Sequence, residues 1–184
     1  MTIIDNNNIQ MDNIINKYFD LSTTQVSKME QMFDVYRFWN NRVNLISRKD
    51  FQYFYERHVL HSLSICKYFD FNDSTKIMDL GTGGGFPGLP LAIMFPNVMF
   101  VLVDSINKKT TALTEIVKEI GLNNIIILNQ RAETVHDRFD FIISRAVAKL
   151  SQIEMWTNGK FSSNHKHSFK NGLICLKGGD LSEE

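Results

Sequence analysis

An acidic residue followed by a glycine-rich loop is the part of this sequence best suited to chemistry. Asp79 comes near the end of a short apolar run, and residues 81–88 then read Gly-Thr-Gly-Gly-Gly-Phe-Pro-Gly. Glycine tolerates positive φ and lets a ligand approach the backbone where a Cβ would block it. A helix after the loop would add unpaired N–H groups and a positive dipole end. We therefore expect a ligand with an adenosine or an anionic end to bind here.

Two ligands compete for this loop. Residues 83–88 satisfy G-x-G-x-x-G, the pattern of dinucleotide-binding loops, although that pattern alone is weak. Pro87 removes one backbone donor that a pyrophosphate needs at a helix start. Asp79 would also place a carboxylate beside two phosphates, whereas it suits a ligand with an ammonium group and a sulfonium. The residues favour S-adenosylmethionine, with a dinucleotide-binding oxidoreductase as the alternative.

Two later positions extend the expected ligand site. Asp104 and Ser105 follow the next apolar run, where a carboxylate can accept hydrogen bonds from both ribose hydroxyls of an adenosine. The alternative role of Asp104 is to cap the following helix together with Ser105. Further on, Ala132 is small enough for a base to approach the backbone, and Glu133 can accept from an amino group. A plain surface loop is the alternative reading of Arg131–Glu133.

After residue 75, predicted strands and helices alternate along the chain, and these elements must position the candidate residues. Apolar runs predict strands over 76–80, 99–103, 125–128, 139–143 and 173–176, and the intervening stretches predict helices over 89–95, 108–120 and 147–156. Repeated β-α-β units with apolar strands indicate an α/β, Rossmann-like fold, mostly a parallel sheet covered on both faces. Ligands bind at the carboxyl ends of such strands, where these acids and glycines fall.

Residues 1–74 are expected to form a helical N-terminal extension of a core over 75–184. Ser22–Gln25 reads as a capping box, Ser47–Asp50 is a second start signal, and Phe71–Ser74 is the expected hinge. Each start signal is followed by apolar residues at helical spacing. The two stripes are Val26, Met29, Phe33, Tyr36 and Val43, and Phe51, Phe54, Tyr55, Val59 and Leu63.

Charge is balanced overall, with 20 Lys+Arg and 20 Asp+Glu, but it is unevenly spread. Residues 1–35 are acidic, and two basic segments flank the glycine loop. They comprise Arg37, Arg42, Arg48, Lys49 and Arg57 before it, and Arg145, Lys149, Lys160, Lys166, Lys170 and Lys177 after it. On one face they would form a footprint for phosphates with salt-sensitive affinity. Scattered solubilising charges are the alternative.

The cysteines and the N-terminus indicate the compartment. Cys66 and Cys175 lie in apolar surroundings without metal-ligand spacing, which favours a reduced, cytoplasmic setting. Met1–Asn8 has neither the basic nor the apolar region of an export signal, and no apolar run approaches bilayer length. We expect a cytoplasmic monomer that uses neither a membrane nor a metal.

Taken together, these residues resemble the bacterial family of 16S ribosomal RNA guanine-N7 methyltransferases, also called glucose-inhibited division protein B. The motifs that carry the resemblance are Trp39–Ser47, Arg57–Leu60 with Ser62-Leu63, Asp79–Gly88, Val103–Ser105, Arg131–Glu133, Ser144–Ala146 and Leu176–Gly178. The resemblance covers nearly the whole chain. It implies a class I S-adenosylmethionine-dependent enzyme that methylates a guanine in the 530 loop, with 16S ribosomal RNA or the small ribosomal subunit as its partner.

The resemblance also implies residue roles. Gly81 and Phe86 would line the cofactor pocket, Arg145 would reach both cofactor and substrate, and Lys177 would face RNA. The whole expected cofactor site is Asp79, Gly81, Thr82, Gly83, Gly85, Phe86, Asp104, Ser105, Ala132, Glu133 and Arg145. The catalytic candidates are Arg145 and Lys177. For Arg145, a salt bridge to Asp140 or Glu133 is the alternative.

The expected methyl transfer requires no general base. Guanine N7 offers a free lone pair and loses no proton on attack, and the chain has neither an Asn-Pro-Pro-Tyr motif nor a paired cysteine nucleophile. Positioning and electrostatics remain as the protein's contribution, and a basic side chain can donate to guanine O6. His58 and Asn44 are weaker candidates, since a histidine within an amphipathic helix is more often a core residue.

Three features depart from the family pattern. His61 stands where the family commonly has an acid, residues 158–171 are polar and irregular, and the chain ends soon after Lys177. A non-catalytic ribosome-binding relative is therefore the second alternative.

Overall fold

The computed structural model describes Met11 and residues 14–180 of the chain. The expectations for Met1–Asn8, for the first part of the helical extension and for residues 181–184 of the core lie outside the described residues. Among the described helices, none combines the length and the apolar composition needed to cross a bilayer.

Five parallel strands form the predicted sheet in the order β3-β2-β1-β4-β5. The strands are β1 Lys76–Leu80, β2 Met99–Asp104, β3 Ile125–Asn129, β4 Phe141–Arg145 and β5 Gly172–Leu176. Leu80, the last residue of β1, is in register with Val103 on one side and Ser144 on the other. The chain therefore builds outward in both directions from β1, and the switch point lies between β1 and β4.

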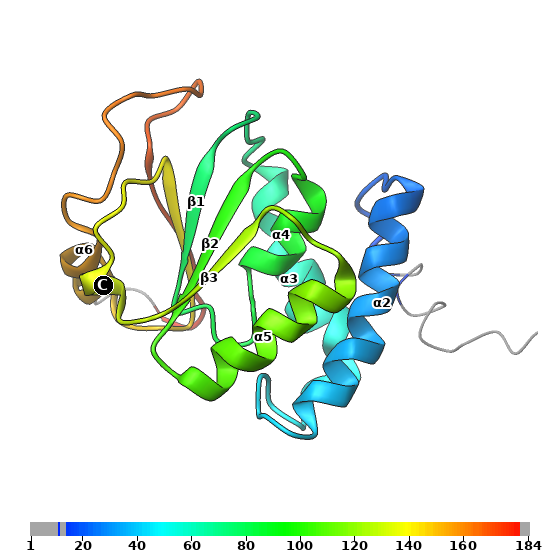
Figure 1. The fold of residues 1–184 in the computed structure, drawn as a ribbon. Helices are drawn as coiled ribbons and strands as arrows, with labels where there is room; N and C mark the ends of the chain where they lie inside the picture. Colours follow the sequence, from blue (N-terminus) through cyan, green and yellow to red (C-terminus); the bar gives the residue numbers. More distant parts are fainter. Residues whose placement is uncertain (1–10, 12–13, 181–184) are drawn as a thin grey trace, which may run out of the picture.

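Alternate residues of each strand pack into two different hydrophobic clusters, as strand geometry requires. In β1, Ile77 packs with the helices on one face and Met78 packs on the other. Helices α4 (Gly88–Met94) and α5 (Asn107–Ile120) cover the first face, α2 (Thr23–Asn40) packs on the outer side of these two helices, and α6 (Leu150–Thr157) covers the second face (Figure 1). The expectation of a sheet covered on both faces is confirmed.

Helix α2 begins at the predicted capping box. The Ser22 Oγ accepts from the Gln25 N–H at 3.3 Å, and the Gln25 side chain accepts from the Ser22 N–H at 2.9 Å. The helix ends at Asn40, so the predicted continuation to Val43 is wrong. The Asn40 Oδ1 accepts from the N–H groups of Leu45 and Ile46 and turns the chain away from the helix axis.

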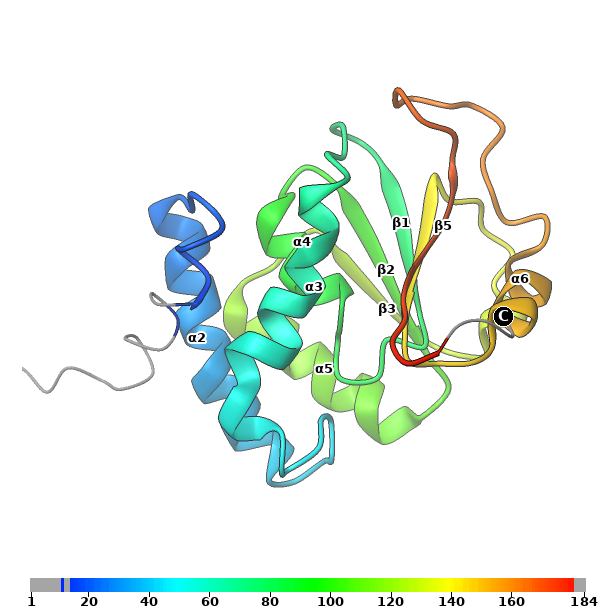
Figure 2. The ribbon, with the colours of Figure 1, turned by 180° about the vertical axis from the view of Figure 1, so that it is seen from behind.

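The second predicted helix forms as a run of short helical pieces. These are η1 (Phe51–Tyr53), the π-helical η2 (Phe54–Leu60), α3 (His61–Leu63) and η3 (Ser64–Lys67). Figure 2 shows them as one run beside α2. The aromatic rings of Phe54 and Tyr55 pack against Phe33, and the Tyr55 hydroxyl donates to the Met29 carbonyl at 3.3 Å.

The predicted bounds of β4 and the predicted start of α6 are wrong. Strand β4 begins and ends two residues later than expected, because Phe139 forms a bridge with Phe161 and the Asp140 carboxylate accepts from the Lys76 N–H. Helix α6 begins at Leu150 instead of Val147, because Ala146 adopts a left-handed φ of 55° that a helix excludes. Both shifts matter, since they make Arg145 the last residue of β4 and leave Val147 in an exposed turn.

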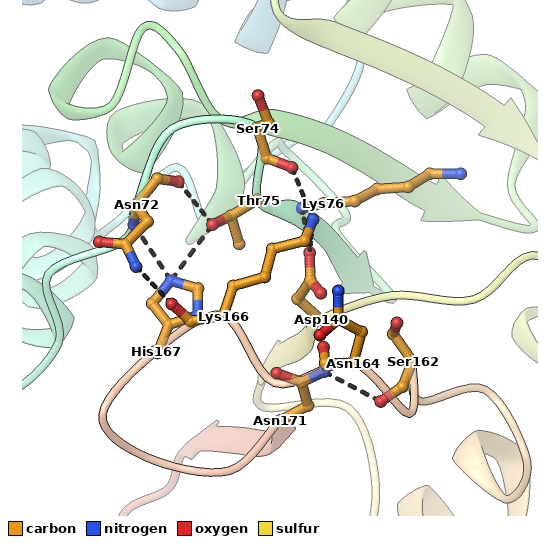
Figure 3. A network of polar contacts seen from close by, with 10 residues as sticks. All are labelled: Asn72, Ser74, Thr75, Lys76, Asp140, Ser162, Asn164, Lys166, His167 and Asn171. Carbon is orange, nitrogen blue, oxygen red and sulfur yellow. Dashed lines mark hydrogen bonds and ion pairs between the residues drawn. The ribbon is translucent and has the colours of Figure 1, made fainter.

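The polar segment between α6 and β5 is ordered by hydrogen bonds at the amino-terminal edge of the sheet (Figure 3). The Asn171 side-chain amide donates to the carbonyls of Ser162 and Asn164, both at 2.9 Å. The Asn72 N–H donates to His167 Nε2 at 3.0 Å. This segment therefore lies at the end of the sheet opposite the glycine loop.

Candidate cofactor and substrate site

The glycine loop joins β1 to α4 through three residues in the left-handed region. Gly81, Gly83 and Gly85 have φ values of 67°, 56° and 90°. Space is also restricted at Gly81, where a Cβ would lie 2.7 Å from a methyl carbon of Val147. The predicted need for glycine in this loop is thus met both by conformation and by close approach.

Asp79 binds this loop from the protein interior. Its fully buried carboxylate accepts through Oδ2 from the Thr82 hydroxyl at 2.7 Å and from the Gly88 N–H at 2.8 Å. The helix-start donor of Gly88, which we expected to be free for a ligand, is therefore used within the protein. Burial raises the pKa of Asp79 to about 6, although these hydrogen bonds and the charge of Arg145 oppose the rise. Its Oδ1 is buried and has no hydrogen-bond partner within the described part of the chain.

The first cavity, of about 270 Å³, opens at the carboxyl ends of β1, β2 and β3. Six predicted cofactor residues line it, namely Gly81, Gly83, Asp104, Ser105, Ala132 and Glu133. Asp104 is fixed there because its two oxygens accept from the N–H groups of Gly83 and Ile106, each at 2.8 Å. Its carboxylate caps the loop rather than the first turn of α5, since the N-cap of that helix is Ile106.

The other predicted cofactor residues do not line this cavity. Arg145 lines the second cavity, described below. Asp79, near the end of β1, and Thr82, Gly85 and Phe86, within the loop, are buried on the side of the loop that faces the protein interior. A Cβ on Gly85 would meet the Tyr36 hydroxyl at 2.8 Å, and the Phe86 ring packs 5.2 Å from the ring of Tyr36. These four residues shape the loop from its inner side.

Several lining residues were missed by sequence reasoning. Ile106, Lys109, Gln130, Val147 and Trp156 all contribute to the first cavity, as does Arg131, which was named only as part of the Arg131–Glu133 turn. Gln130 and Arg131 directly follow β3, so the rule that strand ends carry ligand contacts could have found them. Trp156 comes from α6, and nothing in the sequence tells which face of that helix turns toward the loop.

The second cavity, of about 640 Å³, adjoins the first. It is lined by His58, His61, Arg145, Ala146, Val147, Ala148, Leu176, Lys177, Gly178 and Asp180. Ala146 and Val147 line both cavities. The structure thus brings the catalytic candidates Arg145 and Lys177 to one cavity, at the ends of neighbouring strands as predicted.

Arg145 and Lys177 have defined contacts there. The Lys177 Nζ donates to the Ala148 carbonyl at 2.9 Å. The Arg145 guanidinium donates to the Arg57 carbonyl at 3.2 Å and lies over the Phe86 ring at 5.2 Å. Asp140 sits at the opposite end of β4, where it accepts from the Lys76 N–H. The alternative salt bridge from Arg145 to Asp140 or Glu133 does not form within the described residues.

His58 and His61 bring two further titratable groups to the second cavity. Burial and, after it, the charge of Arg145 lower the pKa of His58 to about 4, so its imidazole is neutral near pH 7. The same two causes lower the pKa of the more exposed His61. Asn44 is exposed on the turn after α2, apart from the residues that line the two cavities.

The basic segment after the glycine loop does not gather on one face. Lys160 is buried and its Nζ donates to the carbonyls of Glu133 and Val135, whereas Lys166 binds Asp140 at the amino-terminal edge of the sheet. The segment before the loop remains exposed, and three of its arginines lie over aromatic rings, with Arg37 5.7 Å from the Phe33 ring centroid. Arg42 is 3.5 Å from the Phe38 ring centroid and Arg57 is 4.0 Å from that of Tyr53.

The parallel sheet, with a glycine loop after β1 and an acid at the end of β2, places the chain among class I S-adenosylmethionine-dependent methyltransferases. A structure of such an enzyme from Thiobacillus denitrificans, in complex with S-adenosyl-L-homocysteine, superposes with a TM-score of 0.50 at 10% identity, over 64% of this chain and 52% of that one. YjhP from E. coli gives a TM-score of 0.51 at 12% identity, over 73% and 53%. At these identities, the two similarities show a shared fold.

The sequence identifies the family within this class. The family described as "rRNA small subunit methyltransferase G" matches residues 25–179. The ribosomal RNA small subunit methyltransferase G of Christiangramia forsetii is 48% identical over 93% of this chain and 82% of its own length, and that of Bacteroides thetaiotaomicron is 49% identical over 93% and 84%. The chain belongs to this family, which confirms the resemblance and sets aside the dinucleotide-binding oxidoreductase.

Proposed function

We propose that this protein transfers the methyl group of S-adenosylmethionine to N7 of a guanine in 16S ribosomal RNA, within the 530 loop. The observation that carries the proposal is the adjacency of the two cavities, which share Ala146 and Val147. One cavity suits a nucleoside with a charged tail, and the other presents an arginine and a lysine. A methyl donor and a guanine placed in them meet across the turn after β4.

The first cavity would hold the cofactor. Asp104 accepts from the ribose hydroxyls, because a carboxylate already bound to two N–H groups keeps acceptor capacity. Ala132 and Glu133 border the adenine, and Ile106 and Trp156 add apolar surface beside it. The methionine part lies over Gly81 and Gly83. The unpaired, buried Oδ1 of Asp79 fits a site that the positive charge of the ligand completes.

The second cavity would present the base. The N7 lone pair attacks the methyl carbon in line with the carbon–sulfur bond, which breaks and leaves neutral S-adenosylhomocysteine and a cationic 7-methylguanine. No proton is removed in this step. Arg145 and Lys177 act by donating to guanine O6 and by fixing the base, a contribution of positioning and electrostatics. We expect the protein to work as a cytoplasmic monomer.

The direct test is a single-turnover assay with radiolabelled S-adenosylmethionine and small subunits that lack the modification. Label found at N7 of a guanine in the 530 loop is the expected result. Binding of the subunit without label transfer would instead favour a non-catalytic ribosome-binding protein. Label at another base would keep the enzyme class and overturn the proposed target. Running the same assay on deproteinised RNA tells whether the assembled particle is required.

A further inference from the structure

The side chain of Arg145 is fixed by the N-terminal helices, although its backbone belongs to the sheet. Its Nη1 donates to the Arg57 carbonyl at 3.2 Å, and its Nη2 lies 3.3 Å from Nδ1 of His58. Both partners belong to the π-helical segment η2. Such windings are rare and are frequent at functional sites.

The contact between His58 and Arg145 has a defined direction. A guanidinium carries only donors, so Nδ1 of His58 must be the acceptor and its ring proton must sit on Nε2. The neutral state of the ring allows this, since burial and the Arg145 charge lower its pKa to about 4. Asp50, Arg57 and His61 are the other charged or titratable groups that act on this ring.

Packing alone does not explain a histidine at this position. Its ring lies among Phe54 and Phe86, with centroids 6.5 Å and 5.3 Å away. Its Nε2 is buried and finds no hydrogen-bond partner among the described residues. Leaving a buried donor unpaired costs free energy, and a phenylalanine would fill the same space without that cost. The polar role of His58 is therefore its Nδ1 contact with Arg145.

We propose that His58 is a positioning residue for methyl transfer, which holds the Arg145 guanidinium in the orientation that faces the target base. The inference rests on the proposed function and on the part assigned there to Arg145. With the Arg57 carbonyl and the Phe86 ring alone, the guanidinium could rotate about its hydrogen bond to the carbonyl. The contact with His58 Nδ1 fixes the guanidinium at a second point and prevents this rotation.

The test compares His58→Ala with His58→Asn, whose amide oxygen can accept near the place of Nδ1. We expect His58→Ala to lower the single-turnover rate at saturating enzyme by about tenfold or more, the scale of a misplaced catalytic group. Binding of S-adenosylhomocysteine, measured by calorimetry, should stay within about twofold, and His58→Asn should recover most of the rate. Glu56→Ala, an exposed change on the same helical segment, is the matched control and should leave the rate unchanged.

A double-mutant cycle decides whether His58 acts through Arg145. If it does, His58→Ala combined with Arg145→Ala is no slower than Arg145→Ala alone, because the second change removes the group that His58 positions. Rate losses that multiply in the double variant would overturn the inference and leave the proposed function intact. Failure of His58→Asn to recover any rate, with its melting temperature equal to wild type, would also overturn it. Absence of label transfer by the wild-type protein would overturn the proposed function, and with it the role of His58.

Discussion

Arg145 is the residue whose replacement should most directly reveal the chemistry. We expect Arg145→Ala to lower the saturating single-turnover rate by roughly a hundredfold or more, the scale of losing one positioned electrostatic donor. Cofactor affinity should change little, because Arg145 lines the second cavity and not the first. Arg138→Ala removes an exposed arginine that binds the Phe161 carbonyl and serves as the control. A normal saturating rate for Arg145→Ala would reduce this residue to an RNA backbone contact.

Asp79 should show a conflict between stability and cofactor binding. Its folded-state pKa of about 6 lies above the ordinary value, so the folded protein holds this proton more tightly than the unfolded chain does. The free energy of unfolding then falls as the pH rises from about 4 to about 6. Asp79→Asn removes this loss, and we expect it to stabilise the protein by up to about 3 kcal/mol above pH 6 and by nothing below pH 4.

The same substitution should weaken cofactor binding. The asparagine keeps an acceptor for Thr82 and Gly88 but lacks the negative charge that Asp79 places beneath the loop, behind the proposed ligand site. We expect the affinity for S-adenosylmethionine to fall by roughly tenfold, and that for S-adenosylhomocysteine by less because it lacks the sulfonium charge. Denaturant unfolding across pH and calorimetry with both ligands measure the two effects. Equal losses for both ligands would contradict an electrostatic role for Asp79.

At the scale of the elements, two glycine substitutions distinguish backbone strain from steric exclusion in the glycine loop. Gly81→Ala combines a left-handed φ with a Cβ that meets Val147, whereas Gly121→Ala, at φ 70°, meets nothing within 4 Å. Both variants should lose about 1 kcal/mol of stability through backbone strain. Only Gly81→Ala should also lose cofactor affinity, by roughly tenfold or more, since its Cβ displaces Val147 from its place in the lining of the first cavity. Equal affinities in the two variants, measured by calorimetry, would show that the loop is not part of the cofactor site.

The elements also show what the sequence could and could not predict. The parallel sheet followed from apolar runs, and the start of α2 from the Ser22 and Gln25 capping box, because both depend on local patterns. The boundary error at β4 arose where a side chain far away in sequence competes with local preference, since Asp140 accepts from the Lys76 N–H. The errors at α2 and α6 have local causes, the Asn40 hydrogen bonds and the left-handed Ala146, which apolar spacing does not reveal. The inner position of the loop residue Phe86 depends on Tyr36 of helix α2, so no local pattern could reveal it. The division between an extension over 1–74 and a core over 75–184 stays a prediction.

At the scale of the molecule, RNA binding must come from the distribution of charge, since the net charge is zero. Arg37, Arg42 and Lys49 are exposed at the end of α2 and on the turn that follows it. We expect each single replacement by glutamine to lower the slope of log affinity against log salt by about one unit, with little change in the saturating rate. Lys118→Gln, an exposed change on α5, is the control. A slope that stays at the wild-type value in all three variants would exclude phosphate contacts there. The measurement is binding to small subunits over a salt series.

One hydrogen bond connects helix α2 to the glycine loop. The Tyr36 hydroxyl of α2 donates to the Gly84 carbonyl at 2.6 Å, and a Cβ on Gly84 would lie 2.8 Å from the Leu45 carbonyl. Helix α2 and the turn after it therefore form the inner wall of the glycine loop, and they also carry the basic residues that we expect to contact RNA. We therefore expect that a recombination that replaced α2 and this turn, and so changed the choice of RNA, would alter cofactor affinity in the same step, so that the two properties would be inherited together.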